Sequence, residues 1–142
     1  MSRFLRRFVK LSIRDQSFFV IAILFAAFLR IHIKFRGFNN TVKLLSMFNT
    51  AKPPETIFYD LERYTKSIEL CYFFSPYINC LAICTAYWWL MKRRGIAVQM
   101  KFGMVKRNEK LVAHSWLEYN GEVFSEDSSK IKKYTAFETS IL

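Results

Sequence analysis

Glycine and proline are scarce in this sequence, at 4 and 3 of its 142 residues. A disordered or linker-rich chain would contain more of both. The chain is instead 52% hydrophobic and 18% aromatic, which is typical of a globular domain with a sizeable core. Internal repeats and low-complexity segments are also absent. We therefore expect one domain that comprises residues 1–142.

Cysteine is scarce as well, and only Cys71, Cys80 and Cys84 are present. Three unevenly spaced cysteines do not suit a disulfide framework, and their gaps match no usual zinc pattern. The two histidines, His32 and His114, lie far apart in the sequence. We expect reduced thiols in a cytoplasmic protein.

Acidic residues are outnumbered, since 22 Lys and Arg face 11 Asp and Glu for a net charge of +11. Residues 1–36 contain eight of the cations and a single acid, Asp15. A basic face of this kind can meet nucleic acid, anionic lipid or an acidic peptide. No motif with base-reading side chains accompanies it, so we expect a solvated or docking surface and no nucleic-acid site.

The sequence lacks an unbroken hydrophobic run long enough to span a membrane. Its longest run is the 12 residues from Phe18 to Leu29, whereas a spanning helix needs about 20. Arg30 and Lys34 follow closely, without the small-residue cleavage site of a signal peptide. The pattern favours a buried helix, and a helix on the inner surface of the membrane is the second interpretation.

Four helices are predicted ahead of any strand. Ser12 and Asp15 form a capping pair for a helix over 12–34, which is interrupted near Gly37. A shorter helix is expected over 41–47, and a third that Pro54 opens and that stops before Pro76. The fourth helix begins at Cys80, after Asn79 as its N-cap, and ends at Gly95.

Strand patterns follow Gly95. Alternation predicts a strand over 96–102, and segments 111–119 and 122–124 flank Asn120-Gly121, a strong hairpin signal. Helices followed by an antiparallel sheet indicate an α+β fold.

Cys80 and His114 are the candidate catalytic residues. Cys80 lies in the first turn of a predicted helix, where unpaired N–H groups and the helix dipole favour a thiolate, whereas Cys71 and Cys84 are expected in the core. If Tyr119 pairs with Glu122, the hairpin register places His114 opposite Asp127. The sequence alone thus supplies the cysteine, histidine and carboxylate of papain-like catalysis.

A set of spaced residues resembles a known family. It comprises Cys80-Leu-x-x-x-x-Ala86, Leu90-x-x-Arg93-Arg94-Gly95-Ile96, Phe102-Gly103, Ala113-His114-x-Trp116-x-Glu118 and Gly121. Together these residues, within 78–127, resemble the transglutaminase-like core, and most closely the B2 proteins of lasso-peptide biosynthesis. The resemblance implies a papain/transglutaminase-like catalytic core over residues 53–142, in which a nucleophile helix packs on a small antiparallel sheet. Residues 1–52 then form a helical, apolar and basic N-terminal part.

The resemblance implies a Cys-His-Asp triad in which Cys80 and His114 match directly. Ser115 stands where the family usually has alanine. The family's aspartate aligns with Glu126, whereas the hairpin register selects Asp127, and a β-bulge could reconcile either choice. Both carboxylates remain candidates for the third position.

The implied activity is that of a leader peptidase. The Cys80 thiolate attacks the carbonyl at the leader–core junction of a ribosomally made precursor peptide, and the reaction requires no metal or organic cofactor. The implied partners are a separate leader-recognition protein and an asparagine-synthetase-like macrolactam cyclase. Two alternatives are a transamidase or acyltransferase on the same residues, and an inactive core that binds peptides or a membrane surface.

Overall fold

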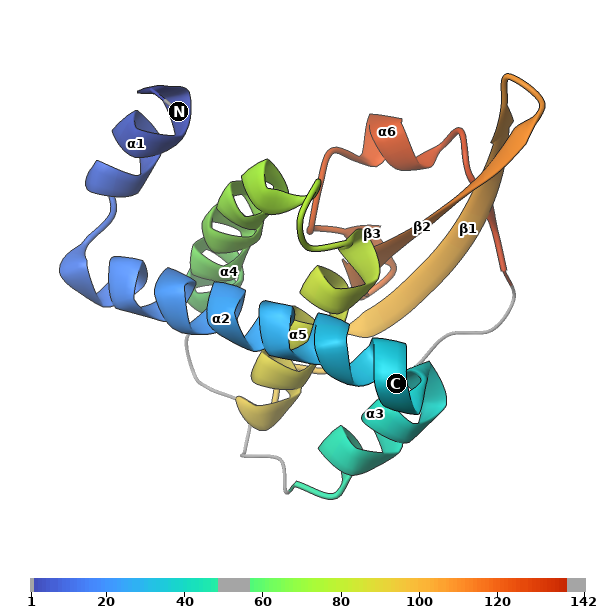
Figure 1. The fold of residues 1–142 in the computed structure, drawn as a ribbon. Coiled ribbons are helices and arrows are strands. Elements are labelled where there is room, and N and C mark those ends of the chain that lie inside the picture. The colour runs from blue at the N-terminus through green and yellow to red at the C-terminus, as the bar shows by residue number, and fades with distance from the viewer. Residues whose placement is uncertain (1, 49–56, 138–142) are drawn as a thin grey trace.

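The computed structural model describes residues 2–48 and 57–137. Six α-helices and a small antiparallel sheet make up this part of the chain, so the predicted α+β class is confirmed (Figure 1). The helices are α1 (Ser2–Val9), α2 (Ile13–Arg36), α3 (Phe38–Ser46), α4 (Ile57–Cys71), α5 (Cys80–Arg93) and α6 (Ser128–Ile131), with a 3-10 helix η1 (Tyr72–Phe74) after α4. The strands are β1 (Gln99–Arg107), β2 (Lys110–Tyr119), β3 (Glu122–Val123) and β4 (Thr135–Ala136), in the order β3-β2-β1-β4.

Helix α5 forms the centre of the core. Every residue from Ala82 to Trp88 is buried, because α2 and α4 pack on the helix from one side and the β1–β2 hairpin packs from the other. A helix that is apolar on nearly all sides is stable in water only in such a position. The basic residues Lys92 and Arg93 are confined to its last turn, where they also complement the helix dipole.

Helix α2 confirms the predicted capping pair and the predicted break at Gly37. The Ser12 hydroxyl accepts a hydrogen bond from the Asp15 amide at 3.2 Å, and Gly37 adopts a φ of 81° at the helix end. The 12-residue apolar run lies within this helix of 24 residues. Of the described residues, α2 is the one helix long and apolar enough to cross a membrane by length and composition, yet one of its faces is buried against the core.

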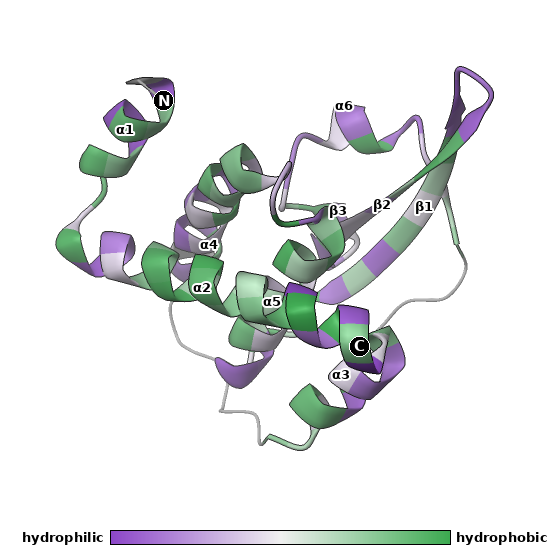
Figure 2. Cartoon of the chain, viewed as in Figure 1, coloured by the Kyte–Doolittle hydropathy of each residue, from purple (hydrophilic) through white to green (hydrophobic). Residues whose placement is uncertain are grey.

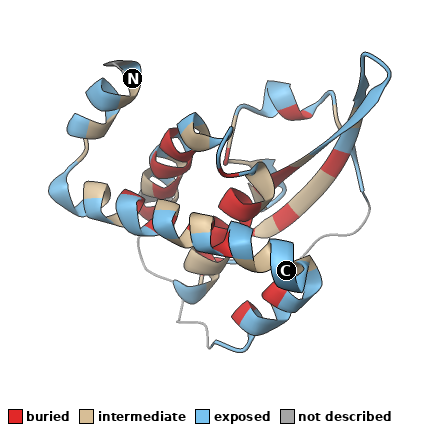
Figure 3. Cartoon of the chain, viewed as in Figure 1, coloured by how far each residue is buried: buried red, intermediate tan, exposed pale blue. Residues whose placement is uncertain are grey.

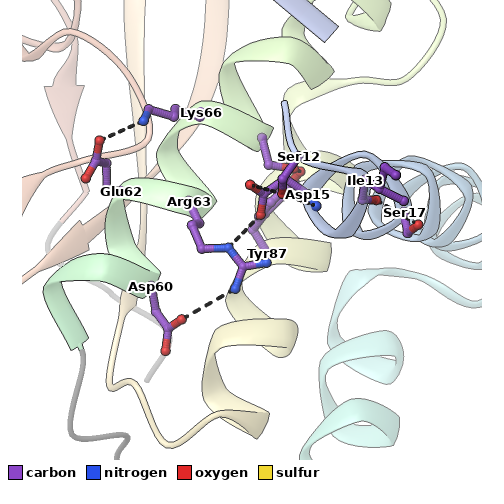
Figure 4. A network of polar contacts seen from close by, with 10 residues as sticks. Ser12, Ile13, Asp15, Ser17, Asp60, Glu62, Arg63, Lys66 and Tyr87 are labelled. Atoms are coloured by element: carbon purple, nitrogen blue, oxygen red, sulfur yellow. Dashed lines mark hydrogen bonds and ion pairs between the residues drawn. The ribbon is translucent and has the colours of Figure 1, made fainter. Parts of the chain in front are cut away.

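An ion network fastens the start of α2 to α4 (Figure 4). Arg63 of α4 donates to Asp15 at 2.6 Å, and a second guanidinium nitrogen lies 3.9 Å from Asp60. Burial alone would raise the pKa of Asp15, but hydrogen bonds from Ser12 and Arg63 lower it overall. Asp15 therefore joins two helices, a role that its position as a cap partner does not reveal.

The hairpin at Asn120-Gly121 is confirmed, because Tyr119 pairs with Glu122 and both turn residues have positive φ. Several boundaries differ from the prediction. Helix α3 begins at Phe38, and β1 runs from Gln99 to Arg107, beyond the predicted 96–102. β1 meets β2 through a second turn at Asn108 and Glu109, both with positive φ, which carries no glycine to signal it. The predicted role of Pro54 lies outside the described residues.

Candidate active site

Cys80 is the first residue of α5 because Asn79 caps the helix in an extended conformation. The Asn79 side chain accepts a hydrogen bond from the Ala82 amide at 3.0 Å, as predicted. Its carbonyl accepts from the Ile83 amide at 3.2 Å. Among the described residues the amides of Cys80 and Leu81 have no hydrogen-bond partner, so free donors and the positive end of the helix dipole surround the half-buried thiol.

His114 lies on β2, directly opposite Gly103 of β1. A β-carbon at Gly103 would come within 2.9 Å of both the Thr135 carbonyl and the Trp116 ring. Glycine is required here because it lets the buried Trp116 ring and strand β4 approach β1. Trp116 is fixed in addition by its indole N–H, which donates to Glu118 at 2.9 Å. The Trp116 ring, packed on Gly103, thus helps to fix how the histidine strand lies against β1.

Glu126 reaches His114 because the chain leaves the sheet after β3. The fully buried Ser125 hydroxyl accepts a hydrogen bond from the Leu117 amide at 3.0 Å, and so takes the place of a further strand residue. The next residue, Glu126, then turns toward the histidine, whose Nε2 lies 2.5 Å from Glu126 Oε1. Both side chains are largely buried, with 16% and 15% of their surfaces exposed.

Asp127 lies elsewhere, which corrects the placement derived from the hairpin register. Ladder pairing between β2 and β3 ends at Glu118 and Val123, so an extrapolation to residue 127 fails. Asp127 is exposed and caps α6, and its carboxylate accepts from the Ser129 amide at 3.0 Å. Of the two candidate carboxylates, the structure brings Glu126 to His114 and leaves Asp127 in solvent.

The electrostatics of Cys80 and His114 reinforce one another. Burial alone would raise the pKa of the Cys80 thiol, but hydrogen bonds with His114 and Ser115 outweigh it and lower the pKa. Burial alone would lower the pKa of His114, but hydrogen bonds with Cys80 and Glu126 and their charges raise it to about 9. Both shifts favour a thiolate beside an imidazolium at neutral pH.

Ser115 supports the charged thiol from β2. Its hydroxyl is buried and has no other hydrogen-bond partner in the described part of the chain, so it is available to the thiolate. The backbone of Ser115 also lowers the Cys80 pKa.

The other two thiols occupy apolar surroundings. Cys84 is fully buried and donates to the Ser115 carbonyl at 3.3 Å, and Cys71 is fully buried 3.2 Å from the Tyr87 hydroxyl. Burial raises the pKa of each thiol to about 12. Both are core residues, as their positions in the sequence indicated.

The sequence did not predict two aromatic neighbours of the site. The ring of Tyr134 stacks on His114, with 5.1 Å between centroids and 28° between planes. The Tyr72 hydroxyl lies 4.0 Å from the Cys84 sulfur, and burial raises its pKa well above the ordinary value. Tyr134 precedes a two-residue strand that carries no periodic signal, so no pattern in the sequence could have placed it beside the histidine.

A cavity of about 450 Å³ opens beside Glu126. Arg7 of α1, Glu69 of α4 and Lys130 of α6 contribute to its lining, so three helices that are distant in sequence meet next to the carboxylate. Within residues 2–48 and 57–137, no three His, Cys, Asp or Glu side chains converge as a metal site would require. The chemistry available here is that of the thiol, the imidazole and the carboxylate.

Comparison with known proteins gives one match. A family model described as the transglutaminase-like superfamily matches residues 25–139, which include Cys80, His114 and Glu126. No curated protein and no solved structure matches the chain. The transglutaminase-like fold that the sequence motifs implied is thereby confirmed.

Proposed function

Since the chain belongs to the transglutaminase-like superfamily, we propose that it is a cysteine peptidase with Cys80 as nucleophile and His114 as general base. The superfamily covers cysteine peptidases and transamidases, and its members usually carry a Cys-His-Asp site. One observation carries the proposal. The thiol at a helix start has a pKa that His114 lowers, and this histidine contacts a buried carboxylate through its Nε2.

The geometry suits the roles of base and orienting carboxylate in such a triad. Glu126 accepts a hydrogen bond from the N–H of His114 Nε2, which leaves Nδ1 for the Cys80 thiol and fixes the orientation of the ring. Glu126 also stabilises the imidazolium that forms when the thiol loses its proton. We therefore propose Glu126 as the third member, in place of the aspartate that is usual in the superfamily.

The reaction proceeds in two steps. The Cys80 sulfur attacks the scissile carbonyl carbon, and amides at the start of α5, that of Cys80 among them, stabilise the oxyanion. The C–N bond then breaks as His114 gives its proton to the leaving amine, and a thioester remains. His114 next removes a proton from water, which attacks the thioester, releases a carboxylate and restores the thiol.

The substrate we propose is the leader–core junction of a ribosomally made precursor, as in lasso-peptide maturation. This finer assignment is supported by the resemblance of residues 78–127 to B2 proteins. The same resemblance supplies the proposed partners, a leader-recognition protein and a macrolactam cyclase. A disordered leader loses entropy on binding, so a separate protein that holds it would raise its concentration at Cys80.

A cleavage assay tests this proposal. The purified chain is mixed with a lasso-type precursor peptide, with and without a protein that binds its leader, and the products are resolved by mass spectrometry. We expect leader and core fragments that accumulate much faster with the partner and are absent with Cys80→Ala. An intact precursor in the complete mixture would refute leader removal.

The transamidase alternative uses the same thioester, which an amine would attack in place of water. Adding a primary amine to the assay separates the two reactions. A peptidase gives the free core and a leader that ends in a carboxylate, whereas a dominant amine adduct of the leader would assign transamidation.

A further inference from the structure

Helix α2 carries large apolar side chains on the face opposite its buried one. The buried face consists of Phe19, Ala22, Ala26 and Leu29. The opposite face, called here the outer stripe, consists of Ile13, Val20, Leu24, Phe28, Ile31 and Phe35, exposed by between 43% and 82%. Their spacing of three, four and seven residues places them on one side of the helix. Figures 2 and 3 show this helix as predominantly hydrophobic and exposed along much of its length.

The length of this exposed apolar stripe indicates that another surface covers it. Contiguous apolar patches on soluble proteins seldom exceed a few hundred Å², and larger ones mark interaction sites. The helix has 24 residues and is therefore about 36 Å long. The stripe runs from Ile13 in its first turn to Phe35 near its end.

The charges around the stripe are almost all positive. On the helix, Arg14 and Lys34 project to either side of the stripe, since each lies within about 90° of its centre at 100° per residue. The further cations of residues 2–48 are Arg3, Arg6, Arg7, Lys10, Arg30, Arg36 and Lys43. Asp15 is the sole acidic residue in this range, and Arg63 already neutralises it at 2.6 Å. These cations would attract a negatively charged surface, and no unpaired carboxylate in this range would repel it.

The opposite face of α2 determines how the helix can meet such a surface. Phe19, Ala26 and Leu29 are buried in the core, and the Asp15–Arg63 ion pair holds the first turn on α4. A spanning orientation would require the helix to leave these partners. The helix can therefore lie along a surface with its outer stripe toward that surface, while its inner face stays packed against the core.

We propose that the outer stripe of α2 docks this protein on a bilayer that contains anionic phospholipid. The apolar side chains enter the boundary between headgroups and acyl chains, and the flanking cations contact lipid phosphates. A second copy of the chain is a poorer occupant, because the same cations would face one another across the contact. The proposal is independent of the reaction assigned to Cys80.

Vesicle co-sedimentation tests the apolar contact. The full chain is mixed with vesicles of phosphatidylcholine alone or with added phosphatidylglycerol, and the bound fraction is measured. We expect binding to the anionic vesicles, and at least about tenfold weaker binding for Leu24→Gln/Ile31→Gln/Phe35→Gln, because three large side chains no longer enter the apolar layer. Leu111→Gln is the matched control, since Leu111 is 69% exposed on β2 and should be dispensable.

A second pair of variants tests the charges. Arg14→Gln and Lys34→Gln should each weaken binding to anionic vesicles about fivefold, since one cation near such a surface contributes about 1 kcal/mol. Arg107→Gln and Lys110→Gln, at the far end of the β1–β2 hairpin, should leave binding unchanged. Unaltered alkylation of Cys80 in every variant shows that the fold is intact.

Four results would overturn the proposal. The first is a wild-type chain that does not bind anionic vesicles, and the second is a triple variant that binds them as tightly as the wild type. The third is a wild-type dimer that the triple variant converts to a monomer, because a second copy would then cover the stripe. The fourth is binding that resists both high salt and carbonate extraction, because α2 would then span the bilayer.

Discussion

Cys80 and Cys84 stand one turn apart on α5 and differ in almost every property that matters for chemistry. Cys84 is fully buried, its sulfur donates to the Ser115 carbonyl, and burial raises its pKa to about 12. Cys80 is half-buried at the helix start and contacts His114, and its pKa is lowered although burial opposes this. Ser115 touches both sulfurs, so the difference arises from His114 and from the end of the helix.

The contrast shows that this helix supplies only one of its two thiols with partners for a negative charge. The first turn offers unpaired amides, an imidazolium and a buried carboxylate behind it. The second turn offers the Ser115 carbonyl, which can accept a hydrogen bond but cannot stabilise a thiolate, and the uncharged Tyr72 hydroxyl 4.0 Å from the sulfur. Four pairs of substitutions probe this site, in order of decreasing expected effect.

The largest effect is expected at the two sulfurs themselves. Cys80→Ala should reduce cleavage of the precursor by about 10⁴-fold or more, because the nucleophile is lost. Cys84→Ala should retain most of the activity, although it leaves a small cavity in the core. Cleavage rates from mass spectrometry measure both. A Cys80→Ala protein that still cleaves would place the nucleophile elsewhere.

The next effect separates the neighbouring carboxylates. Glu126→Gln should reduce kcat/KM by about 10²-fold, because the imidazolium loses its buried counter-charge. Glu126 also raises the pKa of His114, so its removal should move the alkaline limb of the pH–rate profile from about 9 to lower pH. The matched change Asp127→Asn should leave rate and profile unchanged. A greater loss from Asp127→Asn would contradict the geometry.

A third effect concerns the strands that position the histidine. Gly103→Ala should lower the free energy of unfolding by about 1–3 kcal/mol, because the new methyl group meets the Thr135 carbonyl and the Trp116 ring. Met104→Ala, at the more exposed next position, should cost less. Urea unfolding monitored by tryptophan fluorescence compares them. Equal stability of Gly103→Ala and the wild type would show that β4 can move away from β1 without cost.

The smallest effect is expected from the ring stacked on His114. Tyr134→Leu should slow cleavage about two- to tenfold, because an aromatic contact of this kind contributes about 0.5–1.5 kcal/mol. Tyr134→Phe keeps the ring and should behave as the wild type. If Tyr134→Phe loses as much as Tyr134→Leu, the hydroxyl and not the stacking is responsible.

The sequence predicted those parts of the fold that depend on local chemistry. Ser12, Asn79 and the Asn120-Gly121 turn each determine a helix start or hairpin through their own hydrogen bonds or φ preferences, and all three were found where expected. Cys80 and His114 also came from local cues, the helix start and the strand pattern.

The remaining parts of the site depend on contacts that no local pattern encodes. Asp127 was placed opposite His114 by extending a ladder, whereas the buried Ser125 hydroxyl ends that ladder and directs Glu126 to the histidine. Tyr134 reaches the site from the position just before the two-residue strand β4, which pairs with β1. The sequence likewise indicated that α2 is apolar, but only its packing shows which face is covered.

The rate of alkylation by iodoacetamide, followed at each cysteine by peptide mass spectrometry from acid to alkaline pH, tests the central claim most directly. Cys80 should react with a midpoint below the ordinary thiol value of 9.0 and much faster than Cys71 and Cys84, whose pKa values lie at about 12. His114→Ala should move the Cys80 midpoint to higher pH, because the hydrogen bond and the charge that lower it are gone. A Cys80 midpoint at or above 9.0, or one that His114→Ala leaves unchanged, would contradict an activated nucleophile at the start of α5.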